Sequence, residues 1–148
     1  MAFQSILVPV DYSEPSRRAL ELALTLAGDT HVTVVHVWDR PAYVGEEVVA
    51  HADGSRRSLS ELIRSNAERD MTEFLALVKV PPEKTLKHEL ISGDPVSAII
   101  AEASKPGYDV LVVGTNGRTG VTKLLLGSVT EKLIRLSPIP VLTVPPAR

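Results

Sequence analysis

The sequence contains no cysteine, has no excess of basic side chains and lacks a long apolar run. Without cysteine there is neither a disulfide framework nor thiolate chemistry, which fits a reducing cytosol. The 16 basic and 18 acidic side chains are scattered along the chain and give a formal net charge of −2, so no basic stripe indicates a dedicated nucleic-acid-binding protein. No apolar run approaches the about 20 residues that cross a membrane, and the first residues do not resemble a secretion signal. We therefore expect a cytoplasmic protein that binds neither nucleic acid nor membrane.

What the chain does contain is enough apolar surface for a folded core. Hydrophobic residues make up 44% of the 148 residues, and we expect a single domain over 1–148. Short apolar segments of strand character alternate along the chain with segments of helical periodicity. The predicted strands are Ser5–Asp11, His31–Trp38, Lys84–Gly93, Tyr108–Gly114 and Ile139–Val144. This alternation predicts an α/β fold with right-handed crossovers and a parallel sheet that carries helices on both faces.

Capping residues predict where the four helices begin. The predicted N-caps are Ser13, Ser58, Asp94 and Ser128. Ser58 and Ser128 each have a glutamate three residues later, as in a capping box. Gly28 is expected to end the first helix. In the last helix, Val129, Leu133 and Leu136 are expected to form one apolar face.

The segment Asp39–Arg57 shows neither helical nor strand periodicity. We interpret it as a long excursion and Pro41–Arg57 as a mobile lid, because loops of this length are usually functional or disordered. Lys84–Gly93 alternates between apolar and polar residues, which indicates an edge strand with one wetter face. The four histidines lack metal-ligand spacing, and His36 is interpreted as a residue of a core strand.

The predicted sheet also predicts where a ligand would bind. In open parallel sheets, ligands lie beyond the carboxyl ends of the strands, at the point where the strand order reverses. The segments that follow predicted strands are therefore candidates: Asp11, Val37–Asp39 and the loop from Gly114. Asp11 has two interpretations, a carboxylate that faces the ligand and an acid that supports the turn to Ser13.

The loop from Gly114 is rich in glycine, with Gly114, Gly117, Gly120 and Gly127 among the nine glycines of the chain. It contains no P-loop, no G-x-G-x-x-G dinucleotide fingerprint and no G-x-S-x-G elbow. Glycines let backbone N–H groups approach an anion, a helix start at Gly127-Ser128 favours negative charge, and Arg118 and Lys123 add positive charge. Ordinary turns and a helix cap would explain the same glycines, and their number alone does not separate the two interpretations.

The spacing Gly114-x-x-Gly117, nine further residues and then Gly127-Ser128 resembles the G-2x-G-9x-G-(S/T) nucleotide signature of the universal stress protein family. The likeness extends along the chain. ILVPVDYSEPSRRALELA is similar to the family's opening strand and helix, VVHVWD to its second strand, and GSVTEKLIRLSPIPVLTV to its final helix and strand. The resemblance implies a flavodoxin-like, doubly wound five-stranded sheet of order 3-2-1-4-5. It also implies the branch of the family that keeps the signature and binds ATP.

The resemblance further implies roles for individual residues. Asp11 would face the ribose or, through Mg²⁺ or Mn²⁺, the phosphates, and the backbone of Val37 would lie against adenine. Ser128 would serve both as a helix cap and as a phosphate contact. The residues implied to surround the nucleotide are Pro9, Val10, Asp11, Val37, Val113, Gly114, Thr115, Gly117, Arg118, Gly120, Gly127, Ser128, Val129 and Thr130.

The function that the resemblance implies is an ATP-binding regulator of the stress response without catalytic residues. Two alternatives stay open: a slow ATPase or phosphotransferase, and an interaction module whose glycine loop is structural. A nucleotide titration separates the module from the other two, and a single-turnover hydrolysis assay separates the ATPase from the regulator. A homodimer is expected through Ile139–Val144, because this apolar strand lies at a sheet edge in the 3-2-1-4-5 order.

Overall fold

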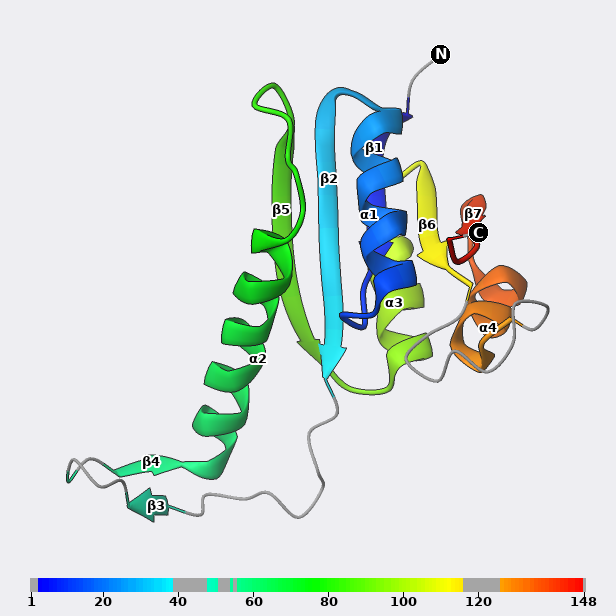
Figure 1. The fold of residues 1–148 in the computed structure, drawn as a ribbon. Helices are drawn as coiled ribbons and strands as arrows, with labels where there is room; N and C mark the ends of the chain where they lie inside the picture. The colour runs from blue at the N-terminus through cyan, green and yellow to red at the C-terminus, as the bar shows by residue number, and fades with distance from the viewer. Residues whose placement is uncertain (1–2, 39–47, 51–53, 55, 116–125, 148) are drawn as a thin grey trace.

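The computed structural model describes residues 3–38, 48–50, 54, 56–115 and 126–147. Its main feature is a five-stranded parallel sheet of order β5-β2-β1-β6-β7 (Figure 1). The strands are β1 (Phe3–Pro9), β2 (Ala27–Trp38), β5 (Thr85–Ser92), β6 (Val110–Gly114) and β7 (Val141–Val144). Counted within this sheet alone, the order is 3-2-1-4-5, so the predicted topology is confirmed. β5 is one edge of the described sheet and has mostly exposed or half-buried side chains, as its alternating sequence predicts.

Helices cover both faces of this sheet, as predicted. The helices α1 (Glu14–Leu26) and α2 (Leu59–Ala76) pack on one face, and α3 (Pro95–Ala103) and α4 (Ser128–Leu136) pack on the other. Side chains of β1 alternate between the two cores. Ile6 and Val8 face α1 and α2, Leu7 faces α3 and α4, and all three are fully buried. The central strand is therefore apolar on both faces, as in other parallel sheets covered by helices.

Three of the four predicted helix starts are confirmed. The hydroxyl of Ser13 accepts a hydrogen bond from the amide of Ser16 and caps α1. Ser58 and Glu61 form the predicted capping box of α2, and the Asp94 carboxylate accepts from the amide of Ser97 at the start of α3. Each cap satisfies a backbone N–H group that the helix itself leaves without a partner.

The prediction that Gly28 ends the first helix is wrong. α1 ends at Leu26, and the chain passes at Ala27, with φ −64° and ψ 133°, directly into β2. A glycine is favoured at a helix end when the chain needs a left-handed residue there, and this junction needs none. The ammonium group of Lys84 instead donates to the carbonyl oxygens of Ala27 and Gly28. A contact from a residue 56 positions after Gly28 thus stabilises the passage from helix to strand.

The expected apolar face of the last helix is also wrong in part. Leu133 is fully buried, but Val129 is 37% and Leu136 is 56% exposed. α4 lies toward the β7 edge of the sheet (Figure 1), and Leu133 packs there with β6 and β7 side chains such as Val113 and Val141. Because α4 lies at the edge of the sheet, only the helix face that carries Leu133 reaches the core, and Val129 and Leu136 remain partly exposed to solvent.

The segment before α2 contains an element that the sequence did not predict. β3 (Val48–Ala50) and β4 (Arg56–Ser58) form an antiparallel pair apart from the main sheet (Figure 1). Most of the expected lid Pro41–Arg57 lies outside the described residues, so the lid stays a prediction. In the described ranges, no helix has both the length and the apolar character needed to cross a membrane.

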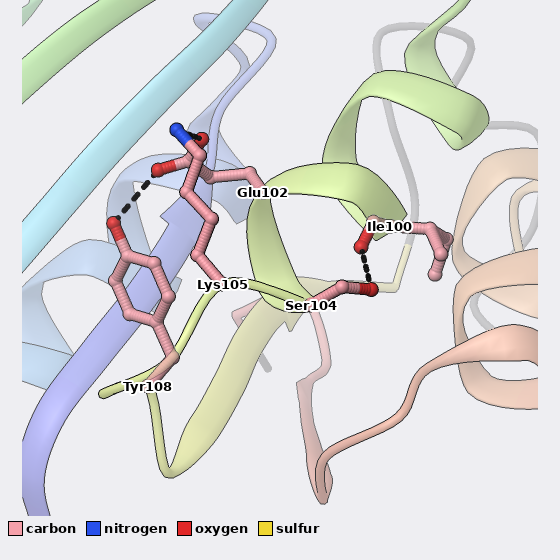
Figure 2. A network of polar contacts seen from close by, with 5 residues as sticks. All are labelled: Ile100, Glu102, Ser104, Lys105 and Tyr108. Carbon is pink, nitrogen blue, oxygen red and sulfur yellow. Dashed lines mark hydrogen bonds and ion pairs between the residues drawn. The ribbon is translucent and has the colours of Figure 1, made fainter.

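A buried carboxylate joins α3 to the strand that follows it (Figure 2). Glu102 is only 4% exposed; its Oε2 lies 2.6 Å from the ammonium nitrogen of Lys105, and its Oε1 accepts from the hydroxyl of Tyr108 at 3.0 Å. Gly107, with φ +112°, turns the chain between these partners in a conformation that favours glycine. Both carboxylate oxygens are thus paired, which a buried charge requires. The network holds the chain between α3 and β6 in place.

This network predicts a loss of stability at alkaline pH. Burial raises the pKa of Tyr108, and the hydrogen bond to Glu102 raises the pKa of Lys105. Both groups hold their proton more tightly in the folded chain. The stabilisation is therefore complete below the ordinary values of 10.0 and 10.5 and is lost as the pH rises above them. We expect Tyr108→Phe to reduce this alkaline loss, as measured by urea unfolding between about pH 8 and pH 11. An identical pH dependence in parent and variant would contradict the role assigned to Tyr108.

Candidate functional site

A cavity of about 290 Å³ lies beyond the carboxyl ends of β1, β2 and β6. It is closed by the first turns of α1, α3 and α4, which begin at the same edge of the sheet. The cavity is therefore at the point where the strand order reverses around β1, as predicted. Its lining consists of Pro9, Val10, Asp11, Ser13, Ser16, Val35, His36, Val37, Pro95, Ile99, Val113, Gly114, Gly127, Ser128, Val129, Thr130 and Leu133.

The turn between β1 and α1 brings polar groups to this cavity. Oδ1 of Asp11 accepts from the amide of Ser13 at 3.0 Å and also from its hydroxyl. The same hydroxyl oxygen accepts from the amide of Ser16 at 3.3 Å, so one short network sets both the turn and the start of α1. Asp11 thus supports the turn to Ser13 and also lines the cavity, and its two predicted interpretations are compatible.

The described residues at the two ends of the connection between β6 and α4 are joined to each other and to the sheet by backbone and hydroxyl groups. The amide of Gly127 donates to the carbonyl of Thr115 at 2.7 Å, and the hydroxyl of Thr130 donates to the carbonyl of Gly114 at 2.8 Å. The amide of Thr115 in turn donates to Val144 in β7 at 3.0 Å. The first turn of α4 is therefore held against the ends of two strands.

The prediction that Ser128 caps this helix through a capping box is wrong. Gly127 is the N-cap and Ser128 is the first helical residue, because the amide of Glu131 donates to the carbonyl of Gly127 at 3.0 Å. The Glu131 side chain pairs with Arg135 instead, at 2.7 Å. No described side chain caps α4, whereas Ser13, Ser58 and Asp94 cap the other three helices. Its first N–H groups stand at the cavity without a described side-chain acceptor.

Gly114 is needed by the packing of the fold. A Cβ atom at this position would lie 2.9 Å from the carbonyl carbon and 3.0 Å from the carbonyl oxygen of Pro15, in the first turn of α1. These are backbone atoms that cannot move aside without moving the helix. The first glycine of the signature thus lets the end of β6 approach α1, and this close approach shapes one wall of the cavity.

The cavity lining combines apolar side chains with polar groups. Val35, Val37, Ile99 and Leu133 provide apolar surface, which suits a flat, weakly polar ring. The α4 N-terminus presents N–H groups and the positive end of a helix dipole, which suit an anion. The volume of about 290 Å³ lies just below the roughly 300–1,000 Å³ typical of ligand sites, so the described walls suit a ligand the size of a nucleoside.

The structure brings most of the predicted site residues together. Those that line the cavity are Pro9, Val10, Asp11, Val37, Val113, Gly114, Gly127, Ser128, Val129 and Thr130. Thr115 is not in the lining; its backbone joins β7 to the start of α4. Gly117, Arg118 and Gly120 lie outside the described residues, so their predicted contacts are unchanged predictions.

Several lining residues were missed by the sequence reasoning. Ser16 follows Ser13 by three residues at the start of α1, and Pro95 and Ile99 lie in the first turns of α3. Helices that follow parallel strands begin at the carboxyl edge of the sheet, so this topology could have indicated their first turns. His36 was interpreted as a core-strand residue, but it is half-buried and its Nδ1 lies 2.8 Å from the carbonyl oxygen of Val10.

The described side chains do not form a complete metal site by themselves. In the ranges that the structure describes, no group of three or more His, Cys, Asp or Glu residues is placed to hold an ion. Asp11 is the acidic side chain in the cavity lining. A single carboxylate fits a Mg²⁺ ion that is held mainly by ligand phosphates and water, which is how Mg²⁺ is usually bound beside nucleotides.

Solved structures share this fold. The universal stress protein UspA from Lactobacillus plantarum is 28% identical, with a TM-score of 0.69, and the match covers 97% of this chain and 99% of that one. A universal stress protein in complex with cAMP is 23% identical, with a TM-score of 0.58 over 97% of this chain and 98% of that one. A family member from Arabidopsis thaliana with AMP bound is 18% identical, with a TM-score of 0.60 over 95% and 90% of the two chains.

Sequence comparisons agree with the fold. A universal stress protein MJ0531 from Methanocaldococcus jannaschii is 33% identical over 147 residues, which cover 96% of this chain and 82% of that protein. A universal stress protein from Thermus aquaticus is 34% identical over 145 residues, which cover 96% of this chain and 98% of that protein. The family model described as the universal stress protein family matches residues 2–145. The chain therefore belongs to the universal stress protein family.

Proposed function

We propose that this protein is a cytoplasmic regulator of the stress response that binds ATP in the cavity beside β1. The observation that carries the proposal is the arrangement of three features around one cavity: the carboxylate of Asp11, an apolar wall that includes Val37, and the α4 N-terminus. Each feature suits a different part of a nucleotide. Their common location supports nucleotide binding more strongly than the glycine spacing alone.

In this proposal the phosphates lie at the first turn of α4. Backbone N–H groups from Ser128 to Thr130 would donate to phosphate oxygens, and the helix dipole would favour their negative charge. Gly117, Arg118 and Gly120 would complete the phosphate site from the loop before α4. Adenine would lie against the backbone of Val37, and Asp11 would bind the ribose or a Mg²⁺ or Mn²⁺ ion held by the phosphates.

Nucleotides in related structures support this assignment. Two solved structures of the same fold contain cAMP and AMP, respectively. Both ligands share an adenosine and a phosphate group with ATP. We extend the assignment to ATP because Gly114, Gly127 and Ser128 stand at the spacing of the ATP-binding signature, and all three line the cavity.

We predict that Gly127→Val weakens ATP binding by roughly tenfold or more, because charge-assisted hydrogen bonds are worth about 1.5–3 kcal/mol each. A valine side chain would stand where phosphate has to approach the backbone. The backbone angles at Gly127, φ −62° and ψ 153°, are open to valine, so the fold is expected to persist. Calorimetric titration with ATP measures the affinity, and circular dichroism checks the fold.

Gly127→Asn and Gly127→Asp provide a pair of controls with nearly equal side-chain size. Both side chains can cap α4, so both variants should be at least as stable to heat as the parent. Only aspartate places a negative charge beside the phosphates, and it should weaken ATP binding more than asparagine does. If the parent and all three variants bound ATP equally, the phosphate site would not be at α4.

Asp11 is expected to contribute its charge to metal-dependent binding. We predict that Asp11→Asn lowers the ATP affinity measured with Mg²⁺ by roughly tenfold and removes most of the metal dependence. The asparagine oxygen can still accept from the amide and hydroxyl of Ser13, so the turn is preserved. Titrations with and without Mg²⁺ test this, and Asp11→Ala, which loses the turn as well, is the comparison. If Asp11→Asn kept the metal dependence of the parent, Asp11 would serve the turn alone.

We also propose that the protein forms a homodimer through β7. This strand is an edge of the described sheet, and Val141, Leu142 and Thr143 are half-buried in the single chain. On the neighbouring helix α4, Leu136 is 56% exposed. Pairing with a second β7 about a two-fold axis would bury these apolar groups and satisfy the edge backbone.

For the dimer, we predict that Leu142→Lys converts the parent from dimer to monomer in sedimentation velocity at micromolar concentration. A charge at this position would have to be buried in the proposed interface. Leu90→Lys is the matched control, because Leu90 lies on the opposite edge strand β5 and packs on the same core cluster as Leu142. It should lower stability by a similar amount without changing the association. A parent that sediments as a monomer would rule out the proposed dimer.

A further inference from the structure

We propose that Tyr12 and His36 act as positioning residues that hold the turn of Asp11 and Ser13 in its ligand-binding form. Tyr12 acts from the core under α1 and α2, whereas His36 also lines the cavity. The proposal deepens the nucleotide-binding function and rests on it for its consequence on affinity. It gives Tyr12, which packs on the α2 side of the sheet and is not in the cavity lining, control over the geometry of the polar groups in the cavity.

The backbone at Tyr12 is the first observation. In the described part of the chain, Tyr12 is the only non-glycine residue with a positive φ, of 65°. A bulky L-residue adopts this left-handed conformation rarely and at a free-energy cost, so the surrounding structure has to hold it there. The result is that Asp11 and Ser13, on either side of Tyr12, both line the cavity.

The Tyr12 side chain lies on the other side of the sheet and is held there by several contacts. Its ring stacks on the ring of His36, with centroids 4.2 Å apart and an interplanar angle of 28°. It also packs at 5.4 Å against Phe74 of α2, and its hydroxyl donates to the carbonyl of Ala67 at 3.4 Å. Tyr12 thus packs with the core under α1 and α2, and it is not part of the cavity lining.

His36 connects this aromatic group to the backbone of the turn. Its Nδ1 lies 2.8 Å from the carbonyl oxygen of Val10, the residue before Asp11. Because a carbonyl oxygen only accepts, the proton of this hydrogen bond belongs to Nδ1. The amide of Val10 donates to the carbonyl of Val35 at 2.8 Å, so Val10 is tied to β2 at both of its backbone polar groups. The turn is therefore held immediately before Asp11 by His36 and immediately after it by Tyr12.

These contacts give the positioning its physical basis. The ring stack and the contacts to α2 offset the cost of the left-handed backbone at Tyr12. Without the ring, the same residue would relax toward negative φ, and the Asp11 and Ser13 side chains would no longer converge on the cavity. Ligand affinity would then fall although the lining residues are all present, because binding would have to reorder the turn.

The test compares ATP affinity in Tyr12→Ala and Tyr12→Phe at a temperature where every variant is folded. Tyr12→Ala should bind ATP about three- to tenfold more weakly, because this is the change in affinity that corresponds to the interaction energy of one aromatic pair. Tyr12→Phe keeps the ring and loses the hydroxyl, whose hydrogen bond to the carbonyl of Ala67 is long at 3.4 Å, so it should stay within about twofold of the parent. His36→Ala should weaken ATP binding at least as much as Tyr12→Ala, because His36 also lines the cavity. The double variant should bind ATP no more weakly than His36→Ala alone, because both residues act through one turn.

Tyr108→Ala is the matched control, since it removes a half-buried tyrosine beside Glu102, outside the cavity lining. It should lower thermal stability and leave the ATP affinity unchanged. A purely structural role of Tyr12 predicts the same behaviour for Tyr12→Ala. Unchanged affinity in a folded Tyr12→Ala would overturn the inference.

A second measurement decides the inference without nucleotide. Backbone NMR shifts of Asp11, residue 12 and Ser13 report the turn in the unliganded protein. We expect them to show the left-handed turn in the parent and in Tyr12→Phe, and its loss in Tyr12→Ala. If Tyr12→Ala retains the turn, the positioning role is wrong even if the parent binds ATP. If the parent binds no ATP but Tyr12→Ala loses the turn, the proposed function fails and the positioning role stands.

Discussion

The pairing of β1 with β2 on one side and with β6 on the other is the interaction on which the site depends. Val8 of β1 lies beside Val34 of β2, and Leu7 lies beside Leu111 of β6. From this central strand the chain goes first to one side of the sheet and later to the other. The connection that leaves β1 goes to α1 on one face of the sheet, and the connection that leaves β6 goes to α4 on the other face. The carboxyl ends of these two neighbouring strands therefore have room between them. The cavity, the Asp11 turn and the start of α4 all lie at this divergence.

The glycines of the signature have different physical roles. Gly114 is required by the packing of β6 against Pro15 and would be needed whether or not a ligand binds. Gly127 stands at a helix start that no described side chain caps, and it leaves backbone N–H groups at the cavity. Only the second role points directly to an anion. A glycine pattern thus combines a requirement of the fold with a possible requirement of the ligand, and the three-dimensional contacts separate the two.

The main polar networks also have separate places in the fold. The buried Glu102 and its partners Lys105 and Tyr108 lie where the chain leaves α3 and enters β6, so they stabilise the start of that strand. Asp109 has a similar effect there, since its carboxylate accepts from the amide of Gln4 at 2.7 Å at the start of β1. The Asp11 network lies at the other end of β1, beside the cavity. Changes in one network can therefore alter stability with little effect on the geometry of the other.

The sequence by itself determined the features that depend on neighbouring residues along the chain. The five strands and the caps Ser13, Ser58 and Asp94 were predicted because apolar periodicity and cap chemistry are readable from short segments. The order of the strands was implied by the resemblance to the family. The position of Asp11 beside the cavity followed from the rule for parallel sheets.

Tertiary structure alone decided the features that depend on distant residues. Lys84 stabilises the junction at which α1 passes into β2, which lies before Gly28. At α4, Gly127 is the N-cap and donates a hydrogen bond to Thr115, so Ser128 is the first residue inside the helix. The left-handed backbone of Tyr12 depends on contacts with His36 and α2, which are 24 or more residues away in the sequence. Such contacts form only when the sheet brings separate segments together. Their free energies then outweigh the local preferences that a sequence pattern reports.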